Sequence, residues 1–137
     1  MHTSRRSTVL LLALAALPAA ADEPLSPLGL WRVDQAQSEP IYDRSQARLE
    51  FGPDGKLSGH TGCKPMIGTY SLTGSQLRVG PVRTGTARCN PLQLEQEDRI
   101  LTALEAAASA RVRPDGLLEL RDADGRGVLR GTRFQQP

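Results

Sequence analysis

Short alternating segments separated by glycine-rich turns are the feature that most constrains the fold of this chain. In residues 47–51, Ala-Arg-Leu-Glu-Phe, apolar and charged side chains alternate with a period of two, which is typical of a strand with one buried face. The Gly-Pro-Asp-Gly sequence at 52–55 then predicts a tight turn, because proline presets one backbone angle and glycine accepts a positive φ. Residues 56–59 begin the return strand.

The same alternation recurs along the rest of the chain. Further strands are expected at 28–33, 68–72, 76–79, 110–113, 118–120 and 128–134, with turns at 73–75, 114–116 and 123–125. The polar segment 35–46, which contains Pro40, is expected to be a loop. Four or more hairpin signals at short spacing favour an antiparallel meander.

One segment, 90–108, follows the helical period instead. Asn90 is a good N-cap, Pro91 suits the first helical position, and Gln93 completes a capping pattern. The expected buried face consists of Leu94, Ile100, Leu101, Leu104, Ala107 and Ala108. The acids expected in solvent near the positive end of the helix dipole are Glu95, Glu97 and Asp98.

Together these elements predict an α+β fold. We expect a strongly curved antiparallel sheet, forming a partial barrel, with one amphipathic helix packed on it. Trp31 is the largest side chain of the first strand. The aromatic residues are few (Trp31, Tyr42, Phe51, Tyr70 and Phe134), so the core must consist mainly of Leu, Val, Ile and Ala.

The N-terminus has the pattern of a secretory signal peptide. Arg5 and Arg6 precede the apolar run 9–17, and small residues at Ala19 and Ala21 suit signal peptidase. The run is too short for a transmembrane helix, which needs roughly 20 apolar residues. We therefore expect a cleaved signal peptide at 1–21, a flexible leader at 22–27 and a single domain at 28–134, with the protein periplasmic or secreted. The alternative is an uncleaved N-terminal anchor.

Removal of the signal peptide changes the charge balance. The full chain has 17 Lys+Arg and 15 Asp+Glu, and the signal peptide contains Arg5 and Arg6 but no acid. The mature chain would then hold 15 basic and 15 acidic residues, with the arginines scattered between apolar positions. A nucleic-acid-binding domain usually keeps a basic patch, so we expect no nucleic-acid partner.

Cys63 and Cys89 are the two cysteines, and an exported domain would carry them into an oxidising compartment. Such a pair usually forms a disulfide. It would close a loop of about 27 residues and stabilise the fold by roughly 3.5 kcal/mol in the chain-entropy description. Two alternatives remain: a soft-metal site in which the thiolates act with His60, and a redox-active pair, although Cys-x-x-Cys is absent.

The stretch 58–70, Ser-Gly-His-Thr-Gly-Cys-Lys-Pro-Met-Ile-Gly-Thr-Tyr, concentrates the unusual residues. A lone mature histidine, His60, cannot form a His-rich zinc site, and no Gly-x-Ser-x-Gly sequence offers a serine nucleophile. We expect no enzyme activity, no metal site and no cofactor. Three glycines in or beside the strands are expected to allow positive φ, a bulge or close strand approach: Gly59, Gly62 and Gly68.

The ordered motifs resemble the META domain family, which includes the HslJ-type heat-shock proteins. The family pattern is Gly-x-x-Gly-Cys-Asn, then Gly-x-Tyr, a hairpin, a Thr-rich strand ending in Cys, and an acidic helix rich in Glu-Gln. The matching residues are Gly59, Gly62, Cys63, Gly68, Tyr70, Thr84, Thr86, Cys89, Glu95 and Gln96, with Leu28-Gly-Leu-Trp31 resembling the family's start. Lys64 departs from the pattern, because it stands where the family usually has Asn.

The resemblance implies a lipocalin-like or secretin-pilot-like architecture and an envelope protein linked to stress tolerance. We therefore expect a non-enzymatic protein with a stress-associated or envelope-maintenance role, which acts by binding. One alternative is a small-molecule or lipid carrier with a cavity between sheet and helix. Another is an inhibitor or adaptor of an envelope enzyme or assembly. The expected partner is a protein or a small hydrophobic ligand, and the expected state is a monomer with no stable membrane anchor.

Overall fold

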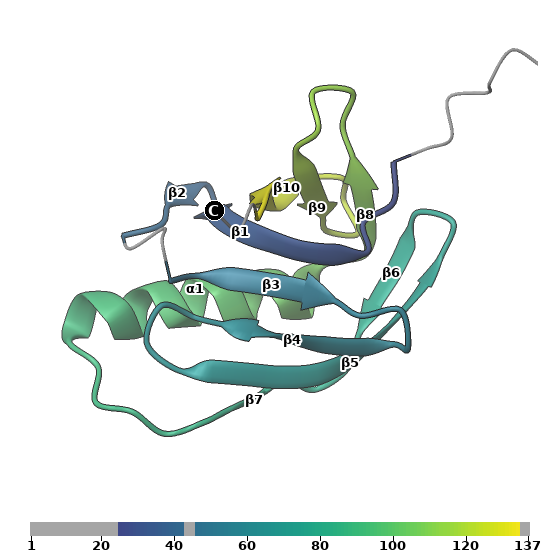
Figure 1. The fold of residues 1–137 in the computed structure, drawn as a ribbon. Coiled ribbons are helices and arrows are strands. Elements are labelled where there is room, and N and C mark those ends of the chain that lie inside the picture. The colour runs from purple at the N-terminus through teal and green to yellow at the C-terminus, as the bar shows by residue number, and fades with distance from the viewer. Residues whose placement is uncertain (1–24, 43–45, 135–137) are drawn as a thin grey trace, which may run out of the picture.

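The computed structural model describes residues 25–42 and 46–134 (Figure 1). The expected signal peptide at 1–21, its cleavage after Ala21 and the leader up to residue 24 lie outside the described residues. Within them, no helix has the length and apolar character needed to cross a membrane.

The described residues form ten strands and one helix. In chain order these are β1 (Gly29–Ala36), β2 (Glu39–Pro40), β3 (Arg48–Phe51), β4 (Lys56–His60), β5 (Pro65–Thr73), β6 (Gln76–Val79), β7 (Arg83–Thr84), α1 (Pro91–Ala106), β8 (Ser109–Val112), β9 (Leu118–Arg121) and β10 (Gly127–Arg133).

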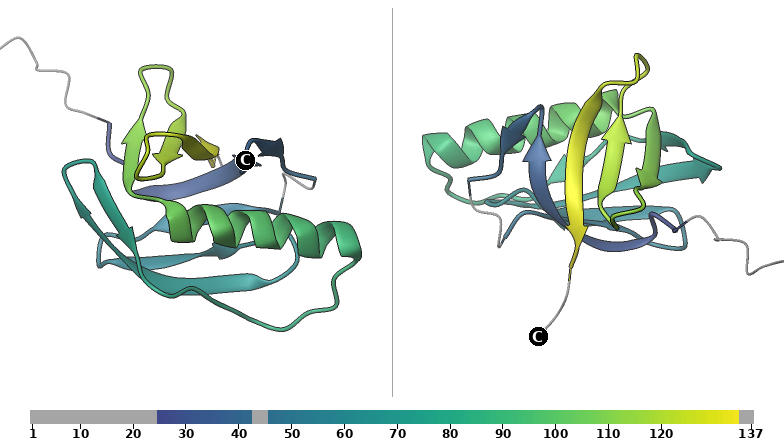
Figure 2. Two further views of the ribbon diagram at one scale, coloured as in Figure 1. Left: turned by 180° about the vertical axis from the view of Figure 1, so that it is seen from behind. Right: turned by 90° about the horizontal axis from the view of Figure 1, so that it is seen from above.

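The strands form one strongly curved antiparallel sheet that returns on itself. Their order is β10-β9-β8-β6-β5-β4-β3-β1-β2, and β1 also pairs with β10, which lies beside it in Figure 2 (right). The ring is uneven, because the β6–β8 register contains the single pair Gln76↔Ser109. The predicted α+β fold, a curved antiparallel sheet with one helix, is therefore confirmed.

Three details of the strand prediction differ from the structure. The expected loop 35–46 contains β2, whose hairpin with β1 turns at Gln37 and Ser38, both with positive φ, without the glycine that usually marks such a turn. Strand β5 begins at Pro65, earlier than predicted. The two-residue strand β7 was missed because it pairs only with Met66 and Ile67 of β5.

Helix α1 lies behind β3 and β4 in Figure 1 and in front of them in the view from behind (Figure 2, left). Asn90 and Gln93 form the predicted capping box, with Pro91 at the helix start, but the helix ends at Ala106 rather than near residue 108. Side chains from the helix and the inner face of the ring share one core: Trp31, Val33, Leu49, Phe51, Leu57, Met66, Ile100, Ala103, Leu104, Leu118 and Leu120.

The predicted buried face of the helix was wrong in part. Leu94 is exposed, and the buried positions are Gln96, Glu97, Ile100, Ala103 and Leu104. The first turn holds no acid, and Glu97 is buried rather than solvated. The helix is turned this way because a loop between β4 and β5 brings polar partners against its N-terminal half.

Candidate functional site

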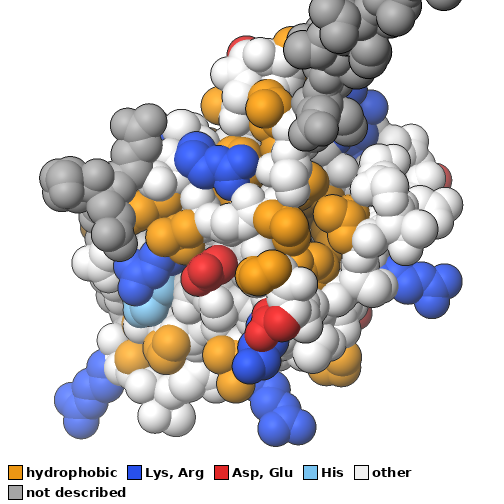
Figure 3. All heavy atoms as spheres, turned by 45° about the vertical axis from the view of Figure 1, so that its right-hand side comes forward, with side chains coloured by type: hydrophobic (Ala, Val, Ile, Leu, Met, Phe, Trp, Pro, Cys, Tyr) orange, Lys and Arg blue, Asp and Glu red, His pale blue; other side chains and the backbone are white. Residues whose placement is uncertain are grey.

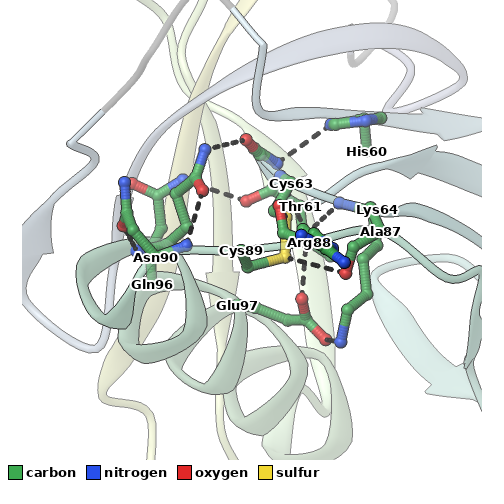
Figure 4. The surroundings of a disulfide bond; sticks show 12 residues. His60, Thr61, Cys63, Lys64, Ala87, Arg88, Cys89, Asn90, Gln96 and Glu97 are labelled. Carbon is green, nitrogen blue, oxygen red and sulfur yellow. Dashed lines mark hydrogen bonds and ion pairs between the residues drawn. A yellow bond between two sulfur atoms is a disulfide. The ribbon is translucent and has the colours of Figure 1, made fainter.

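The disulfide joins the β4–β5 loop to the residue before the helix cap (Figure 4). The Cα atoms of Cys63 and Cys89 lie 5.9 Å apart, and neither cysteine is free. The predicted disulfide is thus present. The alternative of two thiolates acting with His60 would require this bond to be absent.

Thr61 organises the loop that carries Cys63. Its side chain is fully buried, and its hydroxyl accepts hydrogen bonds from the backbone N–H of Cys63 at 3.3 Å and of Lys64 at 3.0 Å. The Thr61 N–H in turn donates to the Lys64 carbonyl at 2.9 Å. This hydroxyl-centred turn holds the loop in one conformation against the helix.

Gln96 connects this loop to the helix. Its side-chain amide is completely buried, donates to the Thr61 carbonyl at 2.9 Å and accepts from the Tyr42 N–H at 2.5 Å. Gly62 lies directly against it: a Cβ at this position would collide with the Gln96 amide nitrogen, and the φ of Gly62 is 99°. Glycine is therefore required here for two independent reasons.

Glu97 and Lys64 form the charged part of the junction. The Lys64 amine lies 3.2 Å from the Glu97 carboxylate, with the two side chains 21% and 9% exposed. The Thr61 hydroxyl also donates to Glu97. The lysine that departs from the family pattern thus neutralises a buried carboxylate, which otherwise would be costly to bury.

His60 lies at the end of β4 with its ring only partly buried. Its Nδ1 accepts a hydrogen bond from the Gly62 N–H at 3.1 Å, and this contact requires Nδ1 to carry no proton. Burial, and secondarily the positive charge of Arg48, lower the pKa of His60. Among the described residues no group of three or more His, Cys, Asp or Glu side chains is placed to hold a metal ion.

The other glycines of the motif permit close backbone approaches. A Cβ at Gly59 would collide with the Arg48 carbonyl across the β3–β4 pair. At Gly68 a Cβ would lie 3.1 Å from the Pro81 carbonyl, where the chain crosses beside β5. Gly59 thus allows close pairing of two strands, and Gly68 allows the β6–β7 connection to lie against β5.

The two aromatic residues of the motif are packing residues as well. The Tyr70 hydroxyl donates to the Gly52 carbonyl, and its ring meets Phe51 edge-to-face at 5.0 Å between centroids. The buried Trp31 indole donates to the Pro27 carbonyl at 2.8 Å, and the Arg133 guanidinium lies 3.8 Å above the indole ring centre.

An open hollow of about 570 Å³ lies on the outer face of β4, β5 and β7. Its lining residues are Lys56, Leu57, Ser58, Ile67, Gly68, Thr69, Pro81 and Arg83. Ile67 is 63% exposed, although its neighbour Met66 points into the core. On the face seen in Figure 3, hydrophobic side chains form several groups, with acidic side chains among them and lysine and arginine side chains projecting around them. We name the hollow lined by these eight residues, from Lys56 to Arg83, the outer hollow.

A second depression of about 430 Å³ separates α1 from the β6–β7 connection. It is lined by Val79, Gly80, Pro81, Val82, Leu101 and Glu105, and it opens to the outside. Further inward, the space between helix and ring is occupied by the buried core. Sequence reasoning identified neither hollow, and it also missed Thr61, Gln96 and Glu97 as members of the junction.

Three solved structures share this fold. A protein from Burkholderia xenovorans has a TM-score of 0.59 at 20% identity, covering 86% of this chain and 94% of that chain. A DUF4847 family protein from Bacteroides vulgatus ATCC 8482 has a TM-score of 0.58 at 15% identity, covering 80% and 94%. A protein solved by NMR has a TM-score of 0.57 at 19% identity, covering 75% and 87%. At these identities the likeness concerns the fold alone.

No curated protein gives a significant sequence match to this chain. The META domain, in contrast, matches residues 25–134, which include the disulfide, the capped helix and the strands described above. The chain therefore belongs to the META domain family.

Proposed function

We propose that this is an exported, non-enzymatic META-domain protein with a stress-associated or envelope-maintenance role, and that it acts by binding at the outer hollow. The observation that carries this proposal is the exposure of Ile67 on the floor of that hollow. Its place in a concave surface matters, because small-ligand sites are usually hollows that combine apolar lining with a few polar or charged groups, here Lys56 and Arg83.

The chemistry of the loop–helix junction supports a non-enzymatic role. His60 accepts a backbone N–H through Nδ1, and both cysteine sulfurs are joined in the disulfide. Glu97 is paired with Lys64 and hydrogen-bonded by Thr61. The groups that made the stretch 58–70 look reactive are therefore engaged in holding the loop. The disulfide is also consistent with an oxidising periplasmic or secreted location.

The two rival binding modes differ in where the ligand would lie. A carrier with a cavity between sheet and helix is favoured by the depression of about 430 Å³ beside Leu101 and Val82. The buried core further inward leaves the ligand little space to enter from there. An inhibitor or adaptor would instead bind its partner at an outer surface, such as that of the outer hollow.

Complementation of a deletion strain tests the proposal. The chromosomal gene is removed, survival under envelope stress is measured, and the strain is complemented with wild type, Ile67→Asp or Leu92→Asp. Leu92 is a matched control because it is also an exposed apolar residue, 52% exposed, but lies on α1 away from the outer hollow.

We expect wild type and Leu92→Asp to restore survival and Ile67→Asp to fail at equal protein levels. Restoration by Ile67→Asp would contradict binding at the outer hollow. Failure of the deletion to reduce survival under heat, detergent and oxidant would contradict the stress-associated role.

A further inference from the structure

We propose that the outer hollow binds an amphiphilic anion as a single molecule: an acyl-type chain that carries a carboxylate or a similar negative head group. This inference rests on the proposed function, because it names the ligand class of the same surface. It follows from the shape of the hollow, its charges and the small number of apolar residues on this face.

The shape of the outer hollow is that of a narrow strip. In the sheet register, Ser58 of β4 lies opposite Ile67 of β5, and Ile67 lies opposite Arg83 of β7. One step along the strands, Lys56 lies opposite Thr69. The exposed apolar part of the floor is therefore Ile67 on β5, with polar side chains on the two flanking strands, a width that admits one extended chain.

The wall on the β7 side is built by the main chain. The Gly80 N–H donates to the Thr69 carbonyl at 2.8 Å, and the Pro81 carbonyl lies close to Gly68 because that residue has no side chain. Proline and hydrogen-bonded backbone have little freedom to collapse into the hollow. The space is thus largely preformed, which lowers the cost of ordering a ligand there.

The charges at the hollow favour an anion. Lys56 and Arg83 line it, and no acidic residue does. Lys56 pairs with Asp54 at 3.5 Å, but both side chains are largely in solvent, where such a pair contributes little. Arg83 has no ion pair or side-chain hydrogen bond to another described residue. Its guanidinium can therefore receive a carboxylate in a bidentate manner.

Glu50 on β3 makes the two sides of the hollow electrostatically different, which would orient a bound ligand. It lies opposite Ser58 of β4 and therefore two strands from Ile67, on the side remote from β7. A negative head group would be repelled from this side and attracted to Arg83. We therefore place the head group beside β7 and the chain along β5.

The apolar content of this face is too small for an ordinary protein interface. The exposed large apolar residues in the described part of the chain are Leu25, Leu28, Tyr42, Ile67, Leu92 and Leu94, and of these Ile67 alone belongs to β4, β5 or β7. A stable protein partner usually buries ~800 Å² on each side around several anchors. A volume of about 570 Å³ lies instead in the range of small-molecule sites.

Calorimetric titration of the purified, disulfide-bonded protein with dodecanoate below its micelle concentration tests this inference. Dodecyltrimethylammonium, which has the same chain and the opposite charge, is the matched ligand control. We expect dodecanoate to bind about tenfold or more tightly than the cation, consistent with one favourable charge contact. Ile67→Asp should abolish binding, and Arg83→Gln should weaken it several-fold.

Two further variants sharpen the test. Glu50→Gln should strengthen dodecanoate binding about twofold, because a modest surface repulsion is removed. Leu92→Asp should leave the affinity unchanged.

Equal affinity for the two amphiphiles, or unchanged affinity of Ile67→Asp, would overturn the inference. So would binding to anionic phospholipid vesicles without binding to monomeric dodecanoate, or a preference for a leucine-centred acidic peptide. If dodecanoate fails to bind while Ile67→Asp still fails to complement, the ligand class is wrong and the proposed function stands. If dodecanoate binds and Ile67→Asp complements, the site stands and the proposed function is wrong.

Discussion

The loop–helix junction and the outer hollow involve neighbouring parts of β4 and β5, yet they differ in almost every physical respect. The junction consists of Thr61, Gly62, Lys64, Gln96 and Glu97 together with the disulfide, and its polar groups are buried and paired. The outer hollow is open, carries an exposed isoleucine and is flanked by cations in solvent.

This difference separates residues that maintain the fold from residues available for binding. Buried polar groups that satisfy one another rigidify a structure, and disturbing them is costly. Exposed side chains with weak or absent partners can be replaced at little cost to stability. Substitutions at the junction should therefore change the free energy of unfolding, whereas those at the hollow should change binding alone.

Removal of the disulfide should have the largest effect. Cys63→Ser with Cys89→Ser should lower the free energy of unfolding by about 3.5 kcal/mol, because the unfolded chain regains the freedom of a long loop. Denaturant unfolding of the variant and the oxidised wild type measures this. A loss below about 1 kcal/mol would mean that the remaining contacts hold the junction without the bond.

Gly62→Ala should have the second-largest effect. It should lower the free energy of unfolding by about 2–3 kcal/mol, because Gly62 has a positive φ and an added Cβ would collide with the buried Gln96. Gly74→Ala is the matched control, because Gly74 also has positive φ but nothing lies within 4 Å of the added Cβ. It should cost about 1 kcal/mol. Equal losses in thermal or denaturant unfolding would show that backbone strain alone accounts for Gly62.

The Lys64–Glu97 pair should show a coupling of about 1–2 kcal/mol, since it is more buried than an ordinary surface pair. A double-mutant cycle of Lys64→Met and Glu97→Gln, followed by denaturant unfolding, measures it. The Arg113–Asp115 pair, at 2.9 Å but with more exposed side chains, serves as a control and should show weaker coupling. Coupling near zero at Lys64 would remove the explanation offered for this departure from the family pattern.

His60 should make a smaller, pH-dependent contribution. Its pKa is lowered from an ordinary value of 6.5, so well above that pH the imidazole is neutral in both the folded and the unfolded state and has no effect on stability. As the pH falls below 6.5, the unfolded chain takes up the proton first and stability decreases. Unfolding curves between pH 7.5 and about 5 should show this decrease. His60→Asn, which keeps an acceptor for the Gly62 N–H, should reduce it, and an identical pH profile would exclude His60 as the cause.

Ile67→Asp should have the smallest effect on stability, within about 0.5 kcal/mol of wild type, because its side chain is mostly in solvent. Thermal unfolding checks this directly. A large loss would mean that Ile67 supports the fold, and the contrast between the two regions would then disappear.

Much of the fold was accessible from sequence because local chemistry determines it. Alternation located most strands, and Asn90, Pro91 and Gln93 marked the helix start. Strand β7 and the β1–β10 closure were not accessible, since they depend on pairing between distant segments.

The junction shows why sequence reasoning failed in part. Gln96 and Glu97 stand four and three residues before Ile100, on the helical period of the buried face, but their polarity argued for solvent. Their burial requires partners from the loop at Thr61 and Lys64, more than thirty residues earlier in the chain. Such partners are visible only once the loop has been placed against the helix.

The most direct test of the contrast is an amide chemical-shift map of the labelled protein during titration with monomeric dodecanoate. We predict the largest shifts at residues 56–58, 67–69 and 83, which line the outer hollow, and small shifts at 61–64 and 93–97. Dominant shifts at the junction, or at Leu101 and Val82 in the second depression, would contradict the assignment of binding to the outer hollow.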